Sequence, residues 1–118
     1  MPSKDPIQRL EDILHNIDRI EEFTAGMDGA AFVKDRKTVD AVERCLERIS
    51  EAAKKLGATV ETLCPDIPWQ SVRGLGNFMR HEYDQIDVNR IWRTVQRDLI
   101  PLKLAVKSAI KTLQDNAT

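Results

Sequence analysis

The segment from Arg73 to Asp84 carries side chains suited to phosphate chemistry. It reads RGLGNFMRHEYD and contains one of the two histidines of the chain, its only tyrosine and two arginines. Guanidinium groups bind phosphate through paired hydrogen bonds, and imidazole exchanges protons near neutral pH. This combination indicates a site that binds a polyanion and moves a proton.

A helical conformation would gather these polar groups on one face of the segment. At about 100° per residue, one arc of roughly 100° holds five polar side chains. They are Arg73, Asn77, Arg80, His81 and Asp84. A second face is apolar and is formed by Val72, Leu75, Met79 and Ile86. The pattern predicts a helix that packs inward on one side and presents chemistry on the other.

The residue types fit binding of a phosphate group and transfer of a proton. His81 is the candidate general base. Arg73 or Arg80 is the candidate for stabilising charge on the phosphate oxygens. Asn77 lies one turn before His81, where it can orient the imidazole or bind substrate. Tyr83 is a candidate hydrogen-bond donor to phosphate or to the leaving oxygen.

Each candidate also has a structural explanation. Arg73 and Arg80 can form ion pairs, with Asp84 or with a neighbouring helix. His81 can be a solvated polar residue, and Tyr83 can lie at the edge of the core. Arg90, Arg93 and Arg97 recur at helical spacing, either as a solvated face or as contacts to RNA or a partner. Trp69 and Trp92 are expected to be core or interface anchors, and His15 is given no role.

Composition limits the class of protein. The 118 residues indicate one domain, residues 1–118, and the net charge of −1 argues against a broadly basic nucleic-acid coat protein. Positive charge is concentrated in residues 69–97, which hold five arginines against three acidic residues. The two cysteines, Cys45 and Cys64, belong to no metal-ligand pattern, so no metal or cofactor is expected. No apolar run has membrane-spanning length, and a cytoplasmic location is expected.

Apolar periodicity predicts an all-α protein. Helices are expected over residues 5–25, from Phe32 or Asp35 to Lys55, over 69–83, and from Asp87 to the C-terminus with a kink or restart at Pro101. A short helical turn is expected in residues 58–64. Long helices with short connections predict an antiparallel four-helix bundle with an additional short helix.

Residues 68–102 resemble HepT-like proteins, which are small all-helical members of the HEPN superfamily (higher eukaryote and prokaryote nucleotide-binding). Nearly the whole chain agrees with them in length and helix order. The resemblance is carried by Pro68-Trp69, Asn77, His81-Glu82-Tyr83, Asp87, Ile91-Trp92, Asp98-Leu99 and Pro101-Leu102.

The resemblance implies a metal-independent endoribonuclease, often the toxin of a toxin–antitoxin pair. Its usual partner is a minimal nucleotidyltransferase (MNT) antitoxin, which can transfer AMP to the tyrosine that corresponds to Tyr83. The family active site typically lies in a cleft between two copies of the chain, so a homodimer is expected. In the implied reaction the RNA 2′-hydroxyl attacks the neighbouring phosphorus with His81 as the general base, and the products are a 2′,3′-cyclic phosphate and a 5′-hydroxyl.

One position departs from the family motif, which has an arginine, four residues, a histidine, one residue and a tyrosine. Counting back from His81 places Gly76 where the arginine is expected. Arg73 and Arg80 are the nearby substitutes. Two functions therefore remain open: a ribonuclease whose cationic role has moved, and a catalytically inactive module that binds RNA, nucleotide or a partner.

Overall fold

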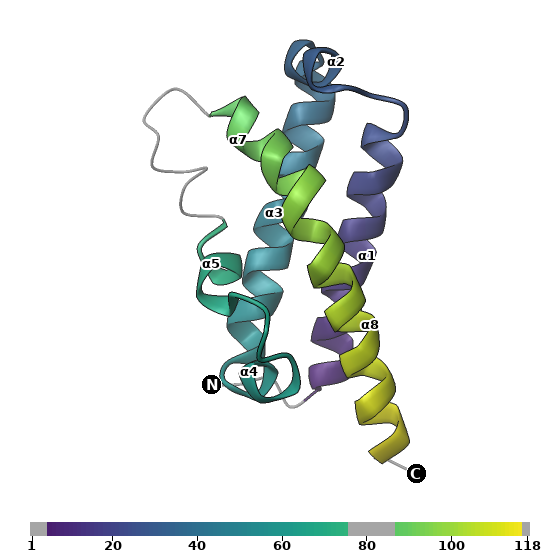
Figure 1. Ribbon diagram of the computed structural model, residues 1–118, viewed down its shortest axis with the longest axis vertical. Coiled ribbons are helices and arrows are strands. Elements are labelled where there is room, and N and C mark those ends of the chain that lie inside the picture. Colours follow the sequence, from purple (N-terminus) through teal and green to yellow (C-terminus); the bar gives the residue numbers. More distant parts are fainter. Residues whose placement is uncertain (1–4, 76–86, 117–118) are drawn as a thin grey trace.

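The computed structural model describes residues 5–75 and 87–116, and within these ranges the chain forms helices and no strands (Figure 1). This confirms the all-α class. The elements are α1 (Pro6–Thr24), α2 (Gly29–Lys34), α3 (Arg36–Leu56), α4 (Thr59–Leu63), α5 (Trp69–Arg73), α7 (Val88–Arg93), the π-helical turn η1 (Thr94–Asp98) and α8 (Leu99–Asn116).

Long helical rods dominate the described part of the chain. α1 and α3 lie side by side in opposite directions, and the rod formed by α7, η1 and α8 crosses beside them (Figure 1). α1 packs most extensively against α3 and also contacts α8. Of the fourth helix predicted over residues 69–83, the structure describes only the first part, which contains α5, and residues 76–83 lie outside the described ranges.

The core is built from the predicted apolar stripes. Leucine and isoleucine side chains of α1 are buried at three- and four-residue spacing, as a helix face requires: Leu10, Ile13, Ile17 and Ile20. The predicted stripe of α3 is buried throughout: Val39, Val42, Cys45, Leu46, Ile49, Ala53 and Leu56. α8 contributes Leu99, Leu102, Val106 and Ala109.

Aspartate side chains cap the starts of α2 and α3. Asp28 Oδ1 accepts a hydrogen bond from the backbone N–H of Ala31 at 2.8 Å and starts α2. Asp35 Oδ1 accepts a hydrogen bond from the N–H of Thr38 at 3.1 Å and starts α3. Asp35 is one of the two residues predicted to begin this helix. Phe32, the other predicted start, belongs to the separate helix α2. α3 ends at Leu56, and its C-cap is Gly57, whose φ of 61° suits glycine.

The predicted continuous helix over residues 69–83 is wrong in its described part, because α5 ends at Arg73. Gly74 is the C-cap, and its N–H donates to the carbonyl of Gln70 at 3.1 Å. Glycine is a poor helix former because ordering it costs more backbone entropy than ordering other residues. The break therefore falls directly before the segment that contains the histidine.

The predicted irregularity at Pro101 lies one turn earlier, in the π-helical turn η1. Proline has no N–H, and its ring crowds the carbonyl four residues before it, here that of Arg97. A wider π turn relieves this crowding and lets α8 continue through Pro101. The predicted cap at Asp87 is confirmed, since its Oδ1 accepts from the N–H of Arg90 at 3.1 Å.

Candidate functional site

Most of the predicted catalytic residues lie outside the described ranges. These are Asn77, Arg80, His81 and Tyr83, together with Gly76 at the departing motif position. The structure describes the two flanks of this segment. α5 and Leu75 precede it, and α7 follows it, so the packing of these flanks fixes where the segment begins and ends.

Trp69 anchors the start of α5 in the core. Its side chain is 2% exposed, and its Nε1–H donates to the carbonyl of Cys64 at 2.9 Å. A buried indole is stable when its one donor is satisfied. The prediction that Trp69 is an anchor is confirmed, and α5 is thereby held against α3.

Arg73 is held by two intramolecular contacts at the end of α5. Its Nη1 lies 2.7 Å from Glu61 Oε1, and its Nη2 donates to the carbonyl of Gly57 at 2.8 Å. The side chain is 24% exposed. Of the two roles considered for Arg73, these contacts match the ion pair with a neighbouring element. In this arrangement the guanidinium joins α5 to α4 and to the end of α3.

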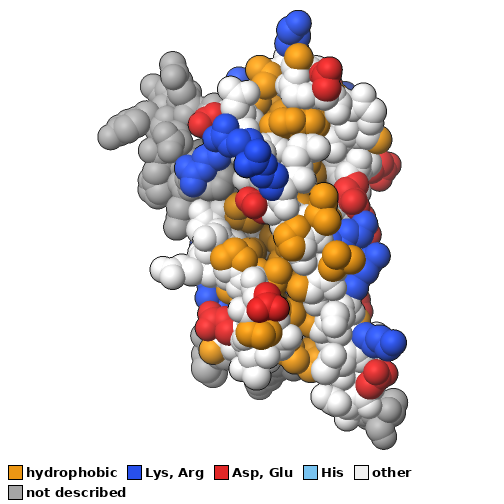
Figure 2. All heavy atoms as spheres, in the orientation of Figure 1, with side chains coloured by type: hydrophobic (Ala, Val, Ile, Leu, Met, Phe, Trp, Pro, Cys, Tyr) orange, Lys and Arg blue, Asp and Glu red, His pale blue; other side chains and the backbone are white. Residues whose placement is uncertain are grey.

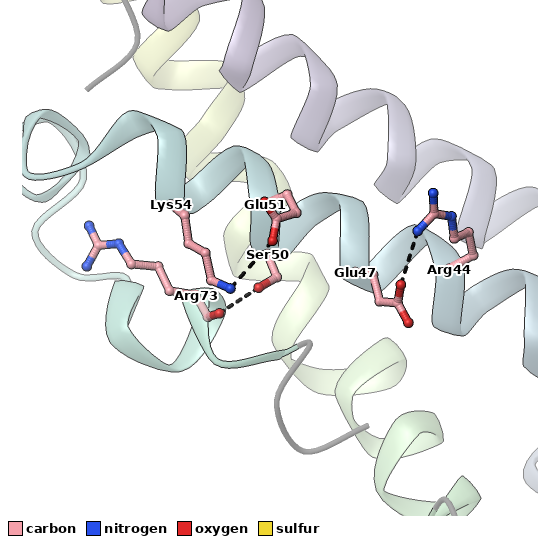
Figure 3. A network of polar contacts seen from close by, with 6 residues as sticks. All are labelled: Arg44, Glu47, Ser50, Glu51, Lys54 and Arg73. Atoms are coloured by element: carbon pink, nitrogen blue, oxygen red, sulfur yellow. Dashed lines mark hydrogen bonds and ion pairs between the residues drawn. The ribbon is translucent and has the colours of Figure 1, made fainter. Parts of the chain in front are cut away.

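The backbone of Arg73 is fixed as well (Figure 3). The fully buried Ser50 donates from Oγ to the Arg73 carbonyl at 2.5 Å, and Figure 3 shows the guanidinium extending away from this contact. Ser50 was not among the predicted residues. Its spacing did carry a signal, because Ser50 falls between Leu46 and Ala53 on the buried stripe and a buried hydroxyl needs a partner.

Three arginines lie exposed on α7 and η1: Arg90, Arg93 and Arg97. Figure 2 shows basic side chains gathered over these two elements. Arg93 and Arg97 form no ion pair with any residue of the described ranges. Their guanidinium groups are therefore available to an anionic partner.

α2, which was not predicted as a separate helix, holds α7 in place. The Phe32 and Trp92 rings have centroids 4.9 Å apart at an interplanar angle of 33°. Trp92 also lies over Gly29, where an added Cβ would be 3.2 Å from the indole nitrogen. The prediction that Trp92 is an anchor is confirmed, and α7 is positioned by its aromatic contact with α2.

A hollow of about 220 Å³ lies between α5 and the η1–α8 region. Its walls are mostly apolar, and Figure 2 shows hydrophobic side chains gathered along this face. The polar groups among its lining residues are Ser71, Thr94 and Asp98. α5 and Leu75, which precede residues 76–86, therefore border this hollow together with η1 and α8. No sequence pattern indicated it.

The cysteines have the environment of core residues. Burial raises the pKa of the Cys45 and Cys64 thiols, so both favour the protonated, unreactive form. Among residues 5–75 and 87–116, no group of three or more His, Cys, Asp or Glu side chains is arranged to hold a metal ion. None of the described helices has the length and apolar character needed to cross a membrane.

The chain is similar to proteins named as ribonucleases. The family described as "Ribonuclease HepT-like" matches residues 13–109. "Probable ribonuclease HepT" of Thermococcus cleftensis is 40% identical over 80% of this chain and 86% of its own length. A candidate RNase of Methanocaldococcus jannaschii is 33% identical over 98% and 99%. Another, of Caldanaerobacter subterraneus, is 31% identical over 92% and 96%. No solved structure matches the chain significantly.

Proposed function

This chain belongs to the HepT-like ribonuclease family, and from that membership we propose that it is a metal-independent endoribonuclease. The observation that carries the proposal is the family match over residues 13–109, which includes the whole RGLGNFMRHEYD segment. Residues 1–118 form a single HepT-like domain in this proposal.

In the proposed reaction His81 removes the proton from a ribose 2′-hydroxyl. The freed oxygen attacks the adjacent phosphorus, and the bond from phosphorus to the 5′-oxygen breaks. The leaving oxygen takes up a proton, which leaves a 2′,3′-cyclic phosphate and a 5′-hydroxyl. Asn77 orients the imidazole, and Tyr83 donates a hydrogen bond to phosphate or to the leaving oxygen.

Arg80 is the preferred phosphate-binding arginine of the proposed site. The guanidinium of Arg73 is already bound to Glu61 and to the Gly57 carbonyl, so releasing it for substrate would break both contacts. We therefore give Arg73 a positioning role. Its contacts fix the end of α5, from which the chain enters the segment that contains His81.

The exposed arginines of α7 and η1 support a role in binding the RNA strand. Arg93 and Arg97 have no ion-pair partner in the described ranges, which leaves their charge available to phosphate. Arg90 belongs to the same exposed set. In the proposal these side chains extend the binding surface beyond the reacting phosphate.

The proposed active form is a homodimer. Ile100 and Leu104 of α8 are 60% and 65% exposed. They lie four residues apart, on one face of the helix, where a second copy would remove both from water. A two-fold axis beside this face would also double the number of cationic groups available to one RNA.

The proposed biological role is that of a toxin in the cytoplasm, neutralised by an MNT antitoxin. The antitoxin would transfer AMP from ATP to the Tyr83 hydroxyl, and pyrophosphate would leave. The added phosphate would place negative charge beside the groups that bind RNA. Co-expression with an MNT protein tests this role: adenylylated Tyr83 in the mass spectrum supports it, and unmodified protein with undiminished toxicity contradicts it.

A second candidate function is a catalytically inactive module that binds RNA, nucleotide or a partner. Two observations favour it. Gly76 replaces the arginine of the family motif. The nearest described arginine, Arg73, is occupied by intramolecular contacts.

Digestion of a defined RNA in the presence of EDTA separates the two functions. The ribonuclease proposal expects cleavage by the wild type, a cyclic phosphate product, and a loss of about 10²–10⁴-fold in His81→Ala. His15→Ala is the matched control, because His15 is the other histidine and lies exposed on α1. Binding of RNA without cleavage by the wild type would support the inactive module instead.

A further inference from the structure

A polar groove between α1 and α3 has no part in the proposed ribonuclease site. Its volume is about 650 Å³, within the range of small-molecule sites. α1 contributes Arg9, Asp12 and Asn16 to its lining. α3 contributes Arg44, Glu47, Arg48, Glu51, Ala52 and Lys55.

The carboxylates of the groove are already paired. Asp12 Oδ2 lies 3.1 Å from Arg9 Nη1, and Glu47 Oε2 lies 3.1 Å from Arg44 Nη1. Glu51 Oε1 lies 3.5 Å from the Nζ of Lys54. Figure 3 shows the Arg44–Glu47 and Glu51–Lys54 pairs along α3. The negative charge of the groove is thus compensated within the chain.

Two cations of the groove remain uncompensated. Arg48 and Lys55 are exposed on α3, and neither forms an ion pair with a residue of the described ranges. They lie seven residues apart, two turns along one face and about 10 Å along the axis. This spacing leaves a small anion within reach of both flexible side chains.

The α1 wall of the groove contains two buried polar atoms that have no hydrogen-bond partner among residues 5–75 and 87–116. Asn16 is 6% exposed, and its Nδ2 donates to the Asp12 carbonyl at 2.8 Å, but its Oδ1 accepts no hydrogen bond from these residues. The Nε of Arg9 likewise donates to no acceptor within them. Buried polar groups are nearly always satisfied by protein, water or ligand. These two atoms require one donor and one acceptor.

We propose that this groove binds a small phosphate monoester that carries hydroxyl or amino donors, such as a sugar phosphate or a mononucleotide. Its phosphate would bind Arg48 and Lys55, with an oxygen accepting from Arg9, and one of its donors would bind Asn16 Oδ1. A small rotation of the Asn16 and Arg9 side chains would expose the two atoms. The three carboxylates disfavour a long nucleic-acid strand, because each would repel further phosphates.

Calorimetric titration of the intact chain with four probes tests the proposal. The probes are inorganic phosphate, adenosine, ribose 5-phosphate and adenosine 5′-monophosphate. Tighter binding of either monoester than of phosphate or adenosine supports the proposal. If both monoesters bind, the ligand is a sugar phosphate. If only adenosine 5′-monophosphate binds, the ligand is a nucleotide. Absence of monoester binding, or equal binding of inorganic phosphate, overturns it.

Variants locate the binding in the groove. The double change Arg48→Gln and Lys55→Gln is expected to weaken monoester binding about tenfold or more. Arg36→Gln with Lys37→Gln is the matched control, since it removes two exposed cations of the same helix outside the groove. Asn16→Leu should weaken the monoester and spare inorganic phosphate. Circular dichroism checks that both double variants are helical. If the groove variant and the control variant then bind the monoester with equal affinity, the ligand binds elsewhere.

Discussion

The Nη2 atom of Arg73 lies 2.8 Å from the carbonyl oxygen of Gly57 and satisfies a backbone acceptor just past the end of α3. The last carbonyls of a helix have no partner within the helix, and a cation near them also interacts favourably with the helix dipole. The same guanidinium reaches Glu61 of α4. One side chain thus ties α5 to the end of α3 and to α4.

Replacing Arg73 should therefore reduce stability whatever its effect on RNA. Arg73→Ala is expected to lower the free energy of unfolding by about 1–3 kcal/mol, because it removes two charge-assisted hydrogen bonds from a largely buried group. Glu61→Gln should cost only a few tenths of a kcal/mol, because Glu61 is 53% exposed. Urea unfolding measures both. Wild-type stability in Arg73→Ala, together with abolished RNA cleavage, would return Arg73 to the catalytic site.

Glu43 is expected to oppose folding at neutral pH. Burial raises the pKa of its carboxyl, and repulsion by Glu47 and Asp40 raises it further. The folded state therefore holds the proton more tightly than the unfolded state. The unfavourable contribution disappears as the pH falls through the raised folded pKa, and it is fully present above it.

Glu43→Gln should accordingly raise the melting temperature at pH 7, and the gain should vanish at low pH, where both states are protonated. Glu11→Gln is a suitable control, because Glu11 is an exposed carboxylate on α1, a different helix. Thermal unfolding is followed by circular dichroism between about pH 3 and about pH 8, which spans the titration of carboxyl groups. It measures the difference in melting temperature between each variant and the wild type. A gain that persists unchanged at the acidic end would contradict this explanation.

The arginines of the α7–η1 surface should contribute to RNA affinity through charge. Arg93→Gln with Arg97→Gln is expected to weaken RNA binding and to make its salt dependence shallower, by about 0.7 in the logarithmic slope for each phosphate that is no longer neutralised. Lys107→Gln with Lys111→Gln is the matched control, because both lysines are exposed on α8. Fluorescence anisotropy at several salt concentrations gives the slope. Identical slopes for the two double variants would remove these arginines from the RNA interface.

The exposed apolar pair of α8 should control the oligomeric state. Ile100→Glu with Leu104→Glu is expected to convert the proposed dimer into a folded monomer, because two charges cannot be buried against a second copy. Val33→Glu is the control, since Val33 is 44% exposed on α2. Light scattering coupled to size exclusion measures the mass. A dimer that survives the α8 change must use another face.

The predictable parts of the fold are those that depend on residues close together in the sequence. The stripe of α3 was predicted residue by residue because buried side chains recur at the helical period. The cap at Asp87 was predicted because its side chain needs only the next turn. The break at Gly74 was missed, since the apolar stripe continues across it and periodicity alone does not show where a helix ends.

The candidate site shows the same division. The chain itself determined the histidine segment, the family resemblance and the stripes that form the core, because residue type and spacing are local properties. Only the tertiary structure decided that Arg73 binds Gly57 and Glu61, that Ser50 holds its carbonyl, and that α2 supports Trp92. These contacts join residues far apart in the sequence, and their formation depends on how the helices pack.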